Sequence, residues 1–462
     1  MTTELAWSDQ TTLFSMNPPT IASRVERLPI CGVHFRFIGL VSIGTWLDFF
    51  DLFMVGYLGA ALQNFHFLTL HQFSELVAAG FVGMFIGTII QGLASDYIGR
   101  RNGFIITLLI YSISSVLGAF SPNAAMLIAM RFVAGIGLSG QQVVVDTFIS
   151  EMIPSHSRGR YVAISQVIGF GAVPVAAYIS SLLVPTHWLL DGWRWVMVIG
   201  GAGGLFAWVL VHWIQESPRW LESRGRVEEA DRIVTQMEEE VERLTGKPLP
   251  PPRPVLVASA HRTPVRELWG PKYRSRTIML VVFNLLQAVG FYGFANWAPT
   301  FILREGNSIA QSLRFGFLIA IAMPFGPLVA VFTTERFERK RTLILLSLLI
   351  ASVGMVFALV RSPLGLVAVG ALEIMLTSWF SSVYHAYQAE LFPTRARATG
   401  VGFVYSWSRV GGFFSTFVIG ALLVYGVPIV FVFLATCMVG VAIVVGFWGP
   451  KTNAIALENL SA

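Results

Sequence analysis

The sequence predicts an all-α membrane protein with twelve transmembrane helices arranged as two pseudo-symmetric six-helix bundles. Three observations support this prediction: a high apolar content, twelve separate apolar runs and an internal repeat. The chain of 462 residues is 55% hydrophobic and only 13% charged, with a mean hydropathy of +0.66. Charged residues make up about 25% of soluble proteins, so this composition excludes an ordinary soluble globular protein.

The apolar residues fall into twelve runs, and a transmembrane helix needs about 20 such residues. The runs cover residues 37–62, 73–94, 103–120, 124–149, 160–184, 193–215, 277–302, 314–333, 342–360, 364–389, 398–424 and 428–448. One long polar stretch separates the sixth run from the seventh. The chain is therefore predicted to consist of a tail (1–36), a first six-helix bundle (37–215), a central loop (216–276), a second six-helix bundle (277–449) and a second tail (450–462).

Lysine and arginine are distributed unevenly over the segments between these runs. If both termini are cytosolic, 26 of the 32 basic residues lie in cytosolic segments, and three, Arg304, Arg314 and Arg361, lie in outer loops. Cytosolic loops of membrane proteins carry an excess of positive charge. The bias predicts a multi-pass protein with both termini in the cytosol, and it explains the net charge of +6 without a nucleic-acid partner.

The central loop contains a charged helical segment, Arg226 to Leu244, and then a proline-rich linker, Lys247 to Pro254. A run of three glutamates, Glu238 to Glu240, lies in the helical segment. We interpret this run as a solvated helix face. The alternative is a latch against the cytosolic ends of the transmembrane helices.

The two halves of the chain repeat each other. Asp96 after the second run corresponds to Glu335 after the eighth, and Glu151 after the fourth run corresponds to Glu390 after the tenth, both at an offset of 239 residues. Parallel repeats of this kind place two bundles around an axis along the membrane normal, with a substrate site between them and alternating access by rocking.

Several motifs resemble those of the major facilitator superfamily, and they span the whole chain. They are Gly92 to Gly103, with Asp96-x-x-Gly99-Arg100-Arg101 at its centre, Arg131 to Gly137, Glu216 to Trp220, Glu390 to Arg397 and Gly449 to Glu458. Three further segments are similar to the aromatic-acid and nicotinate proton symporters: Asp48 to Gly56, Gly290 to Pro299, and Arg397 to Gly412. The span-seven signature of sugar porters is absent. The resemblance implies the major facilitator fold, with a single chain as the transport unit.

Charged residues at the predicted cytosolic helix ends form a candidate gate. Carboxylates and guanidinium groups can pair across neighbouring helix ends, and such pairs are predicted to hold the outward-facing state and to break on opening. The alternative for the arginines is simple anchoring at the cytosolic surface. In the second half Glu338 replaces the motif glycine, which weakens the prediction there. The candidates are Asp96, Arg100, Arg101, Glu151, Arg158, Glu390 and Arg397.

Two acids lie deep in the first run. Asp48 and Asp51 are three residues apart and so share one helical face, in a region where a charge costs about 2.5 to 3.5 kcal/mol on insertion scales. This cost calls for a partner, and Arg131 in the fourth run can hold one aspartate ionised. By the resemblance, the acid that matches Asp51 couples transport to protons. The alternative is a static buried ion pair.

Arg409 in the eleventh run is a second buried cation. A guanidinium group facing a central cavity can bind a carboxylate through two hydrogen bonds, and the resemblance implies a role in anion recognition. Snorkelling, or a bond to Glu373, is the alternative. Glu373 is itself a second candidate for proton coupling, unless it pairs with Arg409 or faces an outer vestibule.

Other polar and aromatic side chains of the inner runs are candidates for substrate binding. Asp146 and His385 occupy equivalent positions in the repeat, and histidine titrates near neutral pH, although a buried histidine with satisfied hydrogen bonds is an equal alternative. Amides and aromatic rings hydrogen-bond and stack on a flat ligand, whereas packing is the alternative for each ring. The remaining candidates are Gln166, Asn284, Gln287, Tyr292, Asn296, Trp379, Tyr384 and Tyr387.

Other function classes lack their motifs. The two cysteines, Cys31 and Cys437, lie at opposite ends of the chain, and no metal-ligand spacing or nucleotide-binding P-loop occurs. We therefore expect no cofactor, no metal and no enzymatic activity.

The sequence predicts a proton-coupled symporter of the bacterial inner membrane that imports a small organic anion, expected to be an aromatic or pyridine carboxylate. Three alternatives stay open. One is a proton-coupled sugar or polyol symporter. Another is a cation or drug antiporter that uses Asp146 and Glu373 as counter-charges. The third is a transporter-like receptor that binds without transporting.

Overall fold

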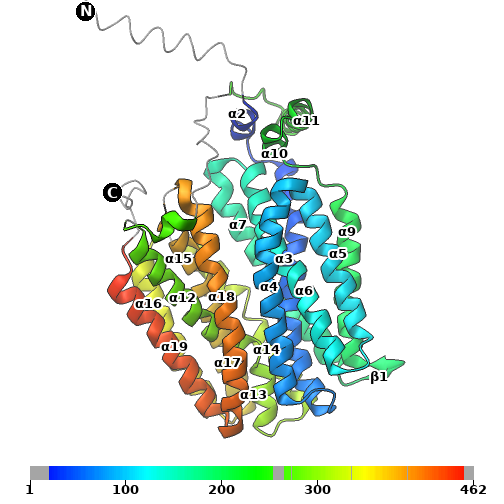
Figure 1. Cartoon of the computed structure of the whole chain (residues 1–462), viewed down its shortest axis with the longest axis vertical. Helices are drawn as coiled ribbons and strands as arrows, with labels where there is room; N and C mark the ends of the chain where they lie inside the picture. Colours follow the sequence, from blue (N-terminus) through cyan, green and yellow to red (C-terminus); the bar gives the residue numbers. More distant parts are fainter. Residues whose placement is uncertain (1–19, 253–264, 272, 334–335, 393, 452–462) are drawn as a thin grey trace, which may run out of the picture.

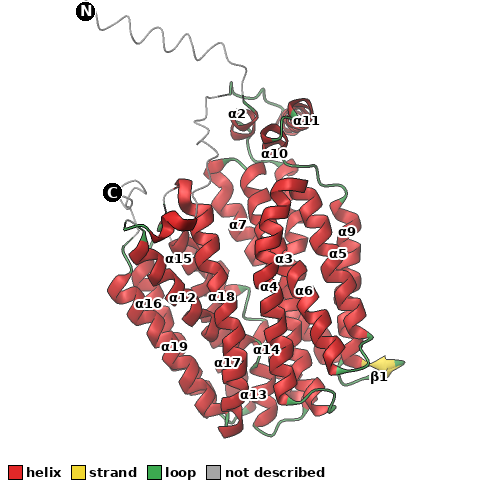
Figure 2. Ribbon diagram, in the orientation of Figure 1, coloured by secondary structure: helices red, strands yellow, loops and turns green. Residues whose placement is uncertain are grey.

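The computed structural model of the chain describes residues 20–252, 265–271, 273–333, 336–392 and 394–451. Within these ranges side chains are described except at residues 92–93, 96, 139–144, 146–147, 150, 155–156, 158–159, 162–163, 265, 267, 389 and 394–399. The described part is almost wholly helical (Figure 2), with one antiparallel pair of two-residue strands, β1 (His187–Trp188) and β2 (Leu190–Asp191).

The first half supplies six membrane-crossing segments. They are α3 (Gly32–Asn64), α4 (Leu70–Ile98), α5 (Arg100–Ala119), α6 (Ala124–Met152), α7 (Ser155–Phe170) continued by α8 (Ala172–Leu183), and α9 (Gly192–Val211). Side-chain caps define where several of them begin, since Thr69 accepts from the Gln72 N–H in a capping box and Asn123 accepts from the Met126 N–H.

The second half supplies the other six. They are α12 (Arg274–Ala295) continued by α13 (Ala298–Arg304), α14 (Ile309–Ala320) continued by α15 (Phe325–Thr333), α16 (Arg339–Leu359), α17 (Pro363–Glu390), α18 (Thr394–Leu422) followed by the short η2 (Leu423–Tyr425), and α19 (Val427–Trp448). The breaks within crossing segments occur next to prolines or glycines, at Pro299, Pro324 and Gly171, which interrupt the helical hydrogen-bond pattern.

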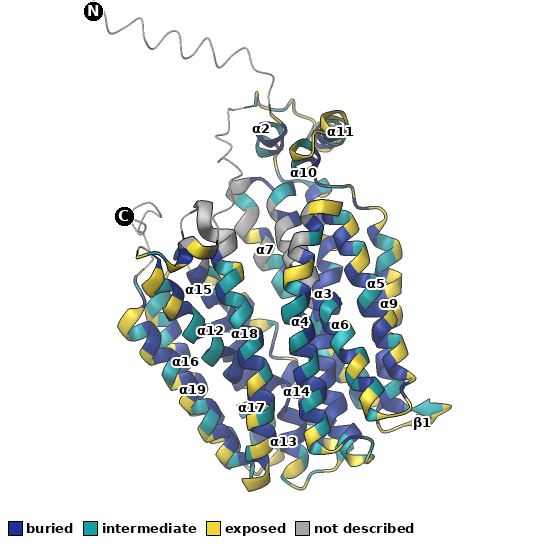
Figure 3. Cartoon of the chain, in the orientation of Figure 1, coloured by how far each residue is buried: buried dark blue, intermediate teal, exposed yellow. Residues whose placement is uncertain are grey.

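The predicted fold class is confirmed. Eleven helical segments of the described residues are long and apolar enough to cross a membrane, and Ala124–Leu138 is the described apolar part of a twelfth, α6. Exposed apolar side chains cover the outward faces of peripheral helices, as at Ile429, Val432 and Ile443 of α19, while the buried residues lie inside the bundle (Figure 3). This arrangement is what a bilayer-facing surface requires.

The two halves pack against each other through four pairs of elements: α4 with α18, α8 with α14, and α3 with both α13 and α14. Aromatic rings fill this interface. The ring centroids of Phe73 and Trp297 are 5.0 Å apart, and those of Phe81 and Tyr292 are 4.9 Å apart. Gly56 of α3 lies directly against the backbone of Asn296, where a side chain would not fit. The close approach of the halves therefore depends on a residue without a Cβ atom.

Three helices outside the membrane segments lie together at one end of the bundle, called here the α11 end; the opposite end, which carries β1, is the β1 end (Figure 1). These helices are α2 (Ile21–Glu26), α10 (Pro218–Ser223) and α11 (Val227–Thr245). They share an apolar cluster of Ile21, Val25, Trp220, Leu221, Ala230 and Val234. The segment before the first crossing helix is therefore docked on the central loop.

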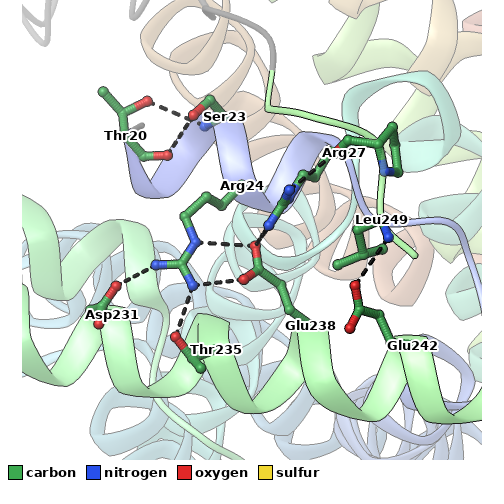
Figure 4. A network of polar contacts seen from close by, with 10 residues as sticks. Thr20, Ser23, Arg24, Arg27, Asp231, Thr235, Glu238, Glu242 and Leu249 are labelled. Atoms are coloured by element: carbon green, nitrogen blue, oxygen red, sulfur yellow. Dashed lines mark hydrogen bonds and ion pairs between the residues drawn. The ribbon is translucent and has the colours of Figure 1, made fainter. Parts of the chain in front are cut away.

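Ion pairs complete this docking (Figure 4). The Glu238 carboxylate accepts hydrogen bonds from the guanidinium groups of both Arg24 and Arg27, at 2.7 and 2.8 Å, and Arg24 also pairs with Asp231. The Glu238 side chain is only 12% exposed, whereas Glu239 is exposed. The interpretation of the glutamate run as a solvated face is therefore wrong for Glu238, because the arginines that cover it come from α2, about 210 residues earlier in the chain.

Replacement of Glu238 by glutamine is expected to loosen α2 from α11. The amide keeps the shape of the carboxylate but removes the charge that holds both arginines, and a hydrogen bond to a charged group contributes about 1.5 to 3 kcal/mol. Amide hydrogen exchange across residues 21–26 should then be about tenfold faster or more. Hydrogen exchange followed by mass spectrometry measures this rate. Glu239→Gln, on the exposed side of the same helix, is the matched control, and an equal effect in both variants would contradict the role assigned to Glu238.

The same contact predicts a pH dependence. Burial raises the pKa of the Glu238 carboxyl, but the hydrogen bonds from Arg24 and Arg27 outweigh burial, and the pKa lies below its ordinary value of 4.5. Because the pKa is lowered in the docked state, the contribution of Glu238 is complete above pH 4.5 and is lost as the pH falls through the lowered pKa. The Glu238→Gln variant should lack this part of the pH response of α2 exchange.

Candidate functional site

A buried ion pair lies in the first half of the molecule. Arg131 of α6 donates from Nη1 to Oδ2 of Asp51 on α3, and the two side chains are 7% and 1% exposed. Gly80 of α4 makes room for this pair, because a Cβ atom at residue 80 would lie 3.1 Å from Arg131 Nε. The structure thus brings together the acid and the arginine that the sequence proposes as partners. It adds Gly80, which sequence reasoning did not identify.

Asp48, one turn before Asp51 on α3, is also buried, at 6% exposure. Its carboxyl interacts electrostatically with Arg409 of the second half and with Tyr111 of the first. Since Tyr111 also interacts electrostatically with Asp51 and Arg131, Asp48 lies between the buried ion pair of one half and the buried arginine of the other.

Arg409 of α18 is surrounded by aromatic side chains. Its guanidinium group donates to the Tyr292 hydroxyl of α12 and lies 5.1 Å from the centre of the Tyr405 ring. On α17, Tyr384 stacks on His385 with ring centroids 4.4 Å apart, and His385 lies 5.1 Å from the Tyr405 ring. A cation beside flat rings is a suitable environment for a planar anion, which can pair with the guanidinium group and stack on a ring.

A chain of amide hydrogen bonds extends from this cluster. Gln287 of α12 donates to Asn284 at 3.5 Å, Asn284 donates to Gln388 of α17 at 3.4 Å, and Gln388 is 3.3 Å from Nδ1 of His385. The sequence predicts Asn284, Gln287 and His385 as site residues but misses Gln388 and Tyr405. Their helical spacing was an available signal, since Gln388 is three residues from His385 and Tyr405 is four residues before Arg409.

Several candidates lie apart from this cluster. Glu373 is 3% exposed and lines a small apolar cavity with Gly354, Phe431 and Met438, and its Oε2 has no hydrogen-bond partner among the described residues. The structure therefore contains no bond from Glu373 to Arg409, and it places Glu373 inside the second bundle. A bond of this kind requires the two groups to face the same space, whereas Glu373 faces α16 and α19.

Other candidates have local structural partners. Trp379 donates from Nε1 to Thr333 of α15 at 3.1 Å, and the buried Tyr387 donates to the Pro450 carbonyl at 2.9 Å, so both tie elements of the second half together. Gln166 is half-buried on α7. Asn296 caps the C-terminus of α12, away from the amide chain. The Asp146 side chain lies outside the described residues.

Charged pairs at the α11 end repeat between the halves. Arg100 pairs with Glu151 at 2.9 Å, and Arg339 pairs with Glu390 at 3.1 Å, with the same offset of 239 residues between equivalent positions. The pairing in the second half is present although Glu338 replaces the motif glycine. Each pair joins two helices of a single half. Their action as a gate stays a prediction, and the side chains of Asp96, Arg158 and Arg397 lie outside the described residues.

Glu216 organises the first of these clusters. Its carboxylate accepts from the backbone N–H groups of Arg100 and Arg101, at 2.9 and 3.1 Å, and so caps the start of α5. Burial raises the pKa of the Glu216 carboxyl, and the backbone hydrogen bonds oppose this shift. Arg101 also donates from Nη2 to the His212 carbonyl at 2.9 Å. Sequence reasoning used Glu216 only as part of a motif and missed this capping role.

Comparison with known proteins places these features in a family. The model of the family described as "Sugar (and other) transporter" matches residues 38–462. The chain is 32% identical to the putative metabolite transport protein YyaJ of Bacillus subtilis over 437 residues, which cover 94% of this chain and 96% of YyaJ. It is 30% identical to the niacin transporter NiaP of Acinetobacter baylyi over 448 residues, or 95% and 99% of the two chains.

The fold also matches solved structures. The partially occluded, inward-open structure of the xylose transporter XylE from E. coli superposes with a TM-score of 0.76, at 18% sequence identity, over 92% of this chain and 99% of XylE. At this level of identity the likeness concerns the fold, so the substrate has to be argued from the side chains described above.

Proposed function

The chain belongs to the sugar (and other) transporter family, a family of multi-pass membrane transporters rather than enzymes, and we propose that it is a proton-coupled symporter for a small organic anion. The expected substrate is an aromatic or pyridine carboxylate. One observation carries this proposal: the buried Asp51–Arg131 pair and the buried Arg409 lie in opposite halves, with Asp48 between them. A protonatable group and an anion-binding group thus face each other across the interface between the bundles.

The Asp51–Arg131 pair supplies the proton switch. An ionised carboxylate beside an arginine is held by charge and hydrogen bonding, and both are lost when the carboxylate takes up a proton. Because the pair is buried, a lone charge left behind is costly, and Arg131 must then find another position. Proton uptake by Asp51 therefore favours a different arrangement of α3 and α6, which is the change that alternating access requires.

Arg409 supplies the anion site. Its planar guanidinium group can make two parallel hydrogen bonds to a carboxylate, while Tyr405 and His385 offer ring faces to an aromatic substrate. The amides of Asn284, Gln287 and Gln388 can bind a ring nitrogen or hydroxyl group. The relative named as a niacin transporter supports this substrate class, because niacin is a pyridine carboxylate.

The alternatives fit these side chains less well. A neutral sugar does not need a buried guanidinium group at its site, and the likeness to a xylose transporter concerns the fold alone. A cationic substrate would be repelled by Arg409, and Glu373 is separated from the interface between the halves. We further infer that the basic α11 end faces the cytosol of a bacterial inner membrane, with both termini on that side, and that the monomer is the transport unit.

Reconstitution in liposomes that contain a pH-sensitive dye tests the proposal. Nicotinate, benzoate, succinate and xylose are added in turn, and protein-free liposomes give the leak of each weak acid, which is subtracted. The expected result is lumen acidification by nicotinate or benzoate above that leak. Acidification by xylose alone would overturn the proposed substrate class, and saturable binding of carboxylates without any proton movement would overturn symport.

A further inference from the structure

Two buried polar atoms near the proton switch have no hydrogen-bond partner among the described residues: Nε of Arg131 and Oδ1 of Asn296. Arg131 uses Nη1 to hold Asp51, so its Nε–H is a separate donor that points elsewhere. Asn296 is 2% exposed, and its carbonyl oxygen is an acceptor. Buried polar groups are nearly always satisfied by protein or by an ordered water.

Both residues line one small cavity at the interface between the halves. Its other walls are apolar and come from α3 and α4: Leu52, Val55, Val77, Gly80, Phe81 and Met84. The cavity has room for about one water molecule. A donor on one side and an acceptor on the other, in an otherwise apolar enclosure, match a molecule that accepts one hydrogen bond and donates another.

Asn296 occupies the joint between α12 and α13. It caps the last turn of α12, and Pro299 lies in the first turn of α13. Its backbone also lies against Gly56 of α3, so the joint is in direct contact with the helix that carries Asp51. A change in Arg131 therefore has a short path to a flexible point of the second half.

We propose that a water molecule binds between Arg131 Nε and Asn296 Oδ1, and that through it Asn296 couples the Asp51–Arg131 pair to the α12–α13 joint. While Asp51 is ionised, it fixes the guanidinium group and so aims Nε at the water. When Asp51 takes up a proton, Arg131 is free to turn, the water loses its donor, and the joint is released from the first half. Asn296 is thus a positioning residue for coupling rather than a substrate ligand.

The charged and titratable groups around Arg131 are consistent with this arrangement. Asp51 and Tyr111 face it from α3 and α5, and Asp48 lies one turn away on α3. Across the interface, Arg409 interacts electrostatically with Asp48. The wall formed by α4 is apolar where it lines the cavity. Asp51 is therefore the acid whose protonation acts most directly on the orientation of Nε.

The inference rests on the proposed proton symport, and its test separates the two. Two variants remove the water from opposite sides: Asn296→Leu removes the acceptor at similar volume, and Gly80→Ala places a methyl group 3.1 Å from Arg131 Nε. Each is compared with wild type for proton-driven nicotinate uptake and for nicotinate counterflow, which needs no net proton movement. Asn307→Leu is the matched control, since the Asn307 amide only donates to the Ile302 carbonyl of α13.

The expected result is that both variants lose about tenfold in proton-driven uptake, as for loss of one hydrogen bond to a charged group, while counterflow stays within about twofold of wild type. Asn296→Ser, which keeps an acceptor and leaves space for a second water, should recover most of the uptake. Unchanged uptake in both variants would overturn the inference, and so would an equal loss of uptake and counterflow. If wild type itself moves no protons with nicotinate, the proposed function fails first.

Discussion

Asp51→Asn is expected to abolish proton-driven accumulation of the substrate while counterflow continues. Asparagine keeps the shape of aspartate and an oxygen that can accept from Arg131, but it cannot take up a proton. Breaking a buried ion pair by removing one charge costs about 3 to 5 kcal/mol, so the cycle of pairing and release should slow by about a hundredfold or more. Uptake driven by an imposed pH gradient, compared with counterflow in the same proteoliposomes, measures the effect.

Asp48→Asn is the matched control for this variant, because Asp48 lies on the same face of the same helix. Asp48 interacts with Arg409 rather than forming the ion pair with Arg131. We therefore expect Asp48→Asn to change the affinity for the anion, by altering the charge near Arg409, and to keep coupling to protons. The reverse outcome, with coupling lost in Asp48→Asn and kept in Asp51→Asn, would assign the switch to Asp48.

The crossing helices were predictable because the signals that define them are local. Twelve apolar runs became twelve crossing segments, and the structure mainly extends them with polar residues at the ends, as in α3, which begins at Gly32 rather than at residue 37. The breaks inside four segments were less visible, since an apolar run continues through Gly171, Pro324 or Asn296. Hydropathy reports burial in lipid and does not report where the backbone changes direction.

The candidate site was predictable only in part. Asp51 and Arg131 could be matched because a buried charge in an apolar run needs a partner, and few charges were available. Tyr405, Gln388 and Gly80 carry no such cost, so nothing in the sequence sets them apart from packing residues. Their roles depend on which faces of α4, α17 and α18 turn towards the interface, and helix rotation is set by tertiary packing.

The internal repeat was more informative than its sequence match suggests. Glu338 replaces the motif glycine in the second half, yet Arg339 and Glu390 form the pair that corresponds to Arg100 and Glu151. The pair survives because it needs only the two charged residues at the facing helix ends, whereas the glycine governs the turn before them. Repeat symmetry therefore predicts side-chain contacts even where the intervening motif has changed.

Arg409→Ala is expected to remove most of the affinity for a carboxylate substrate. The guanidinium group is 6% exposed and lies against Tyr292 and Tyr405, so a bound carboxylate would pair with it away from water. Losing a buried, hydrogen-bonded charge partner costs about 2 to 5 kcal/mol, which corresponds to an increase in Kd of about thirtyfold or more. Isothermal titration of nicotinate into the purified protein measures Kd, and the KM of counterflow gives an independent value.

Two further variants separate the charge of Arg409 from its shape. Arg409→Lys keeps the charge but loses the planar fork, so it should recover only part of the affinity, because a lysine cannot make two parallel hydrogen bonds to one carboxylate. Arg361→Ala removes an exposed guanidinium group paired with Glu305 near the β1 end and should leave Kd unchanged. If Arg409→Ala and Arg361→Ala bind nicotinate equally well, Arg409 is not the anion site. Its burial beside Asp48 would then be a matter of helix packing.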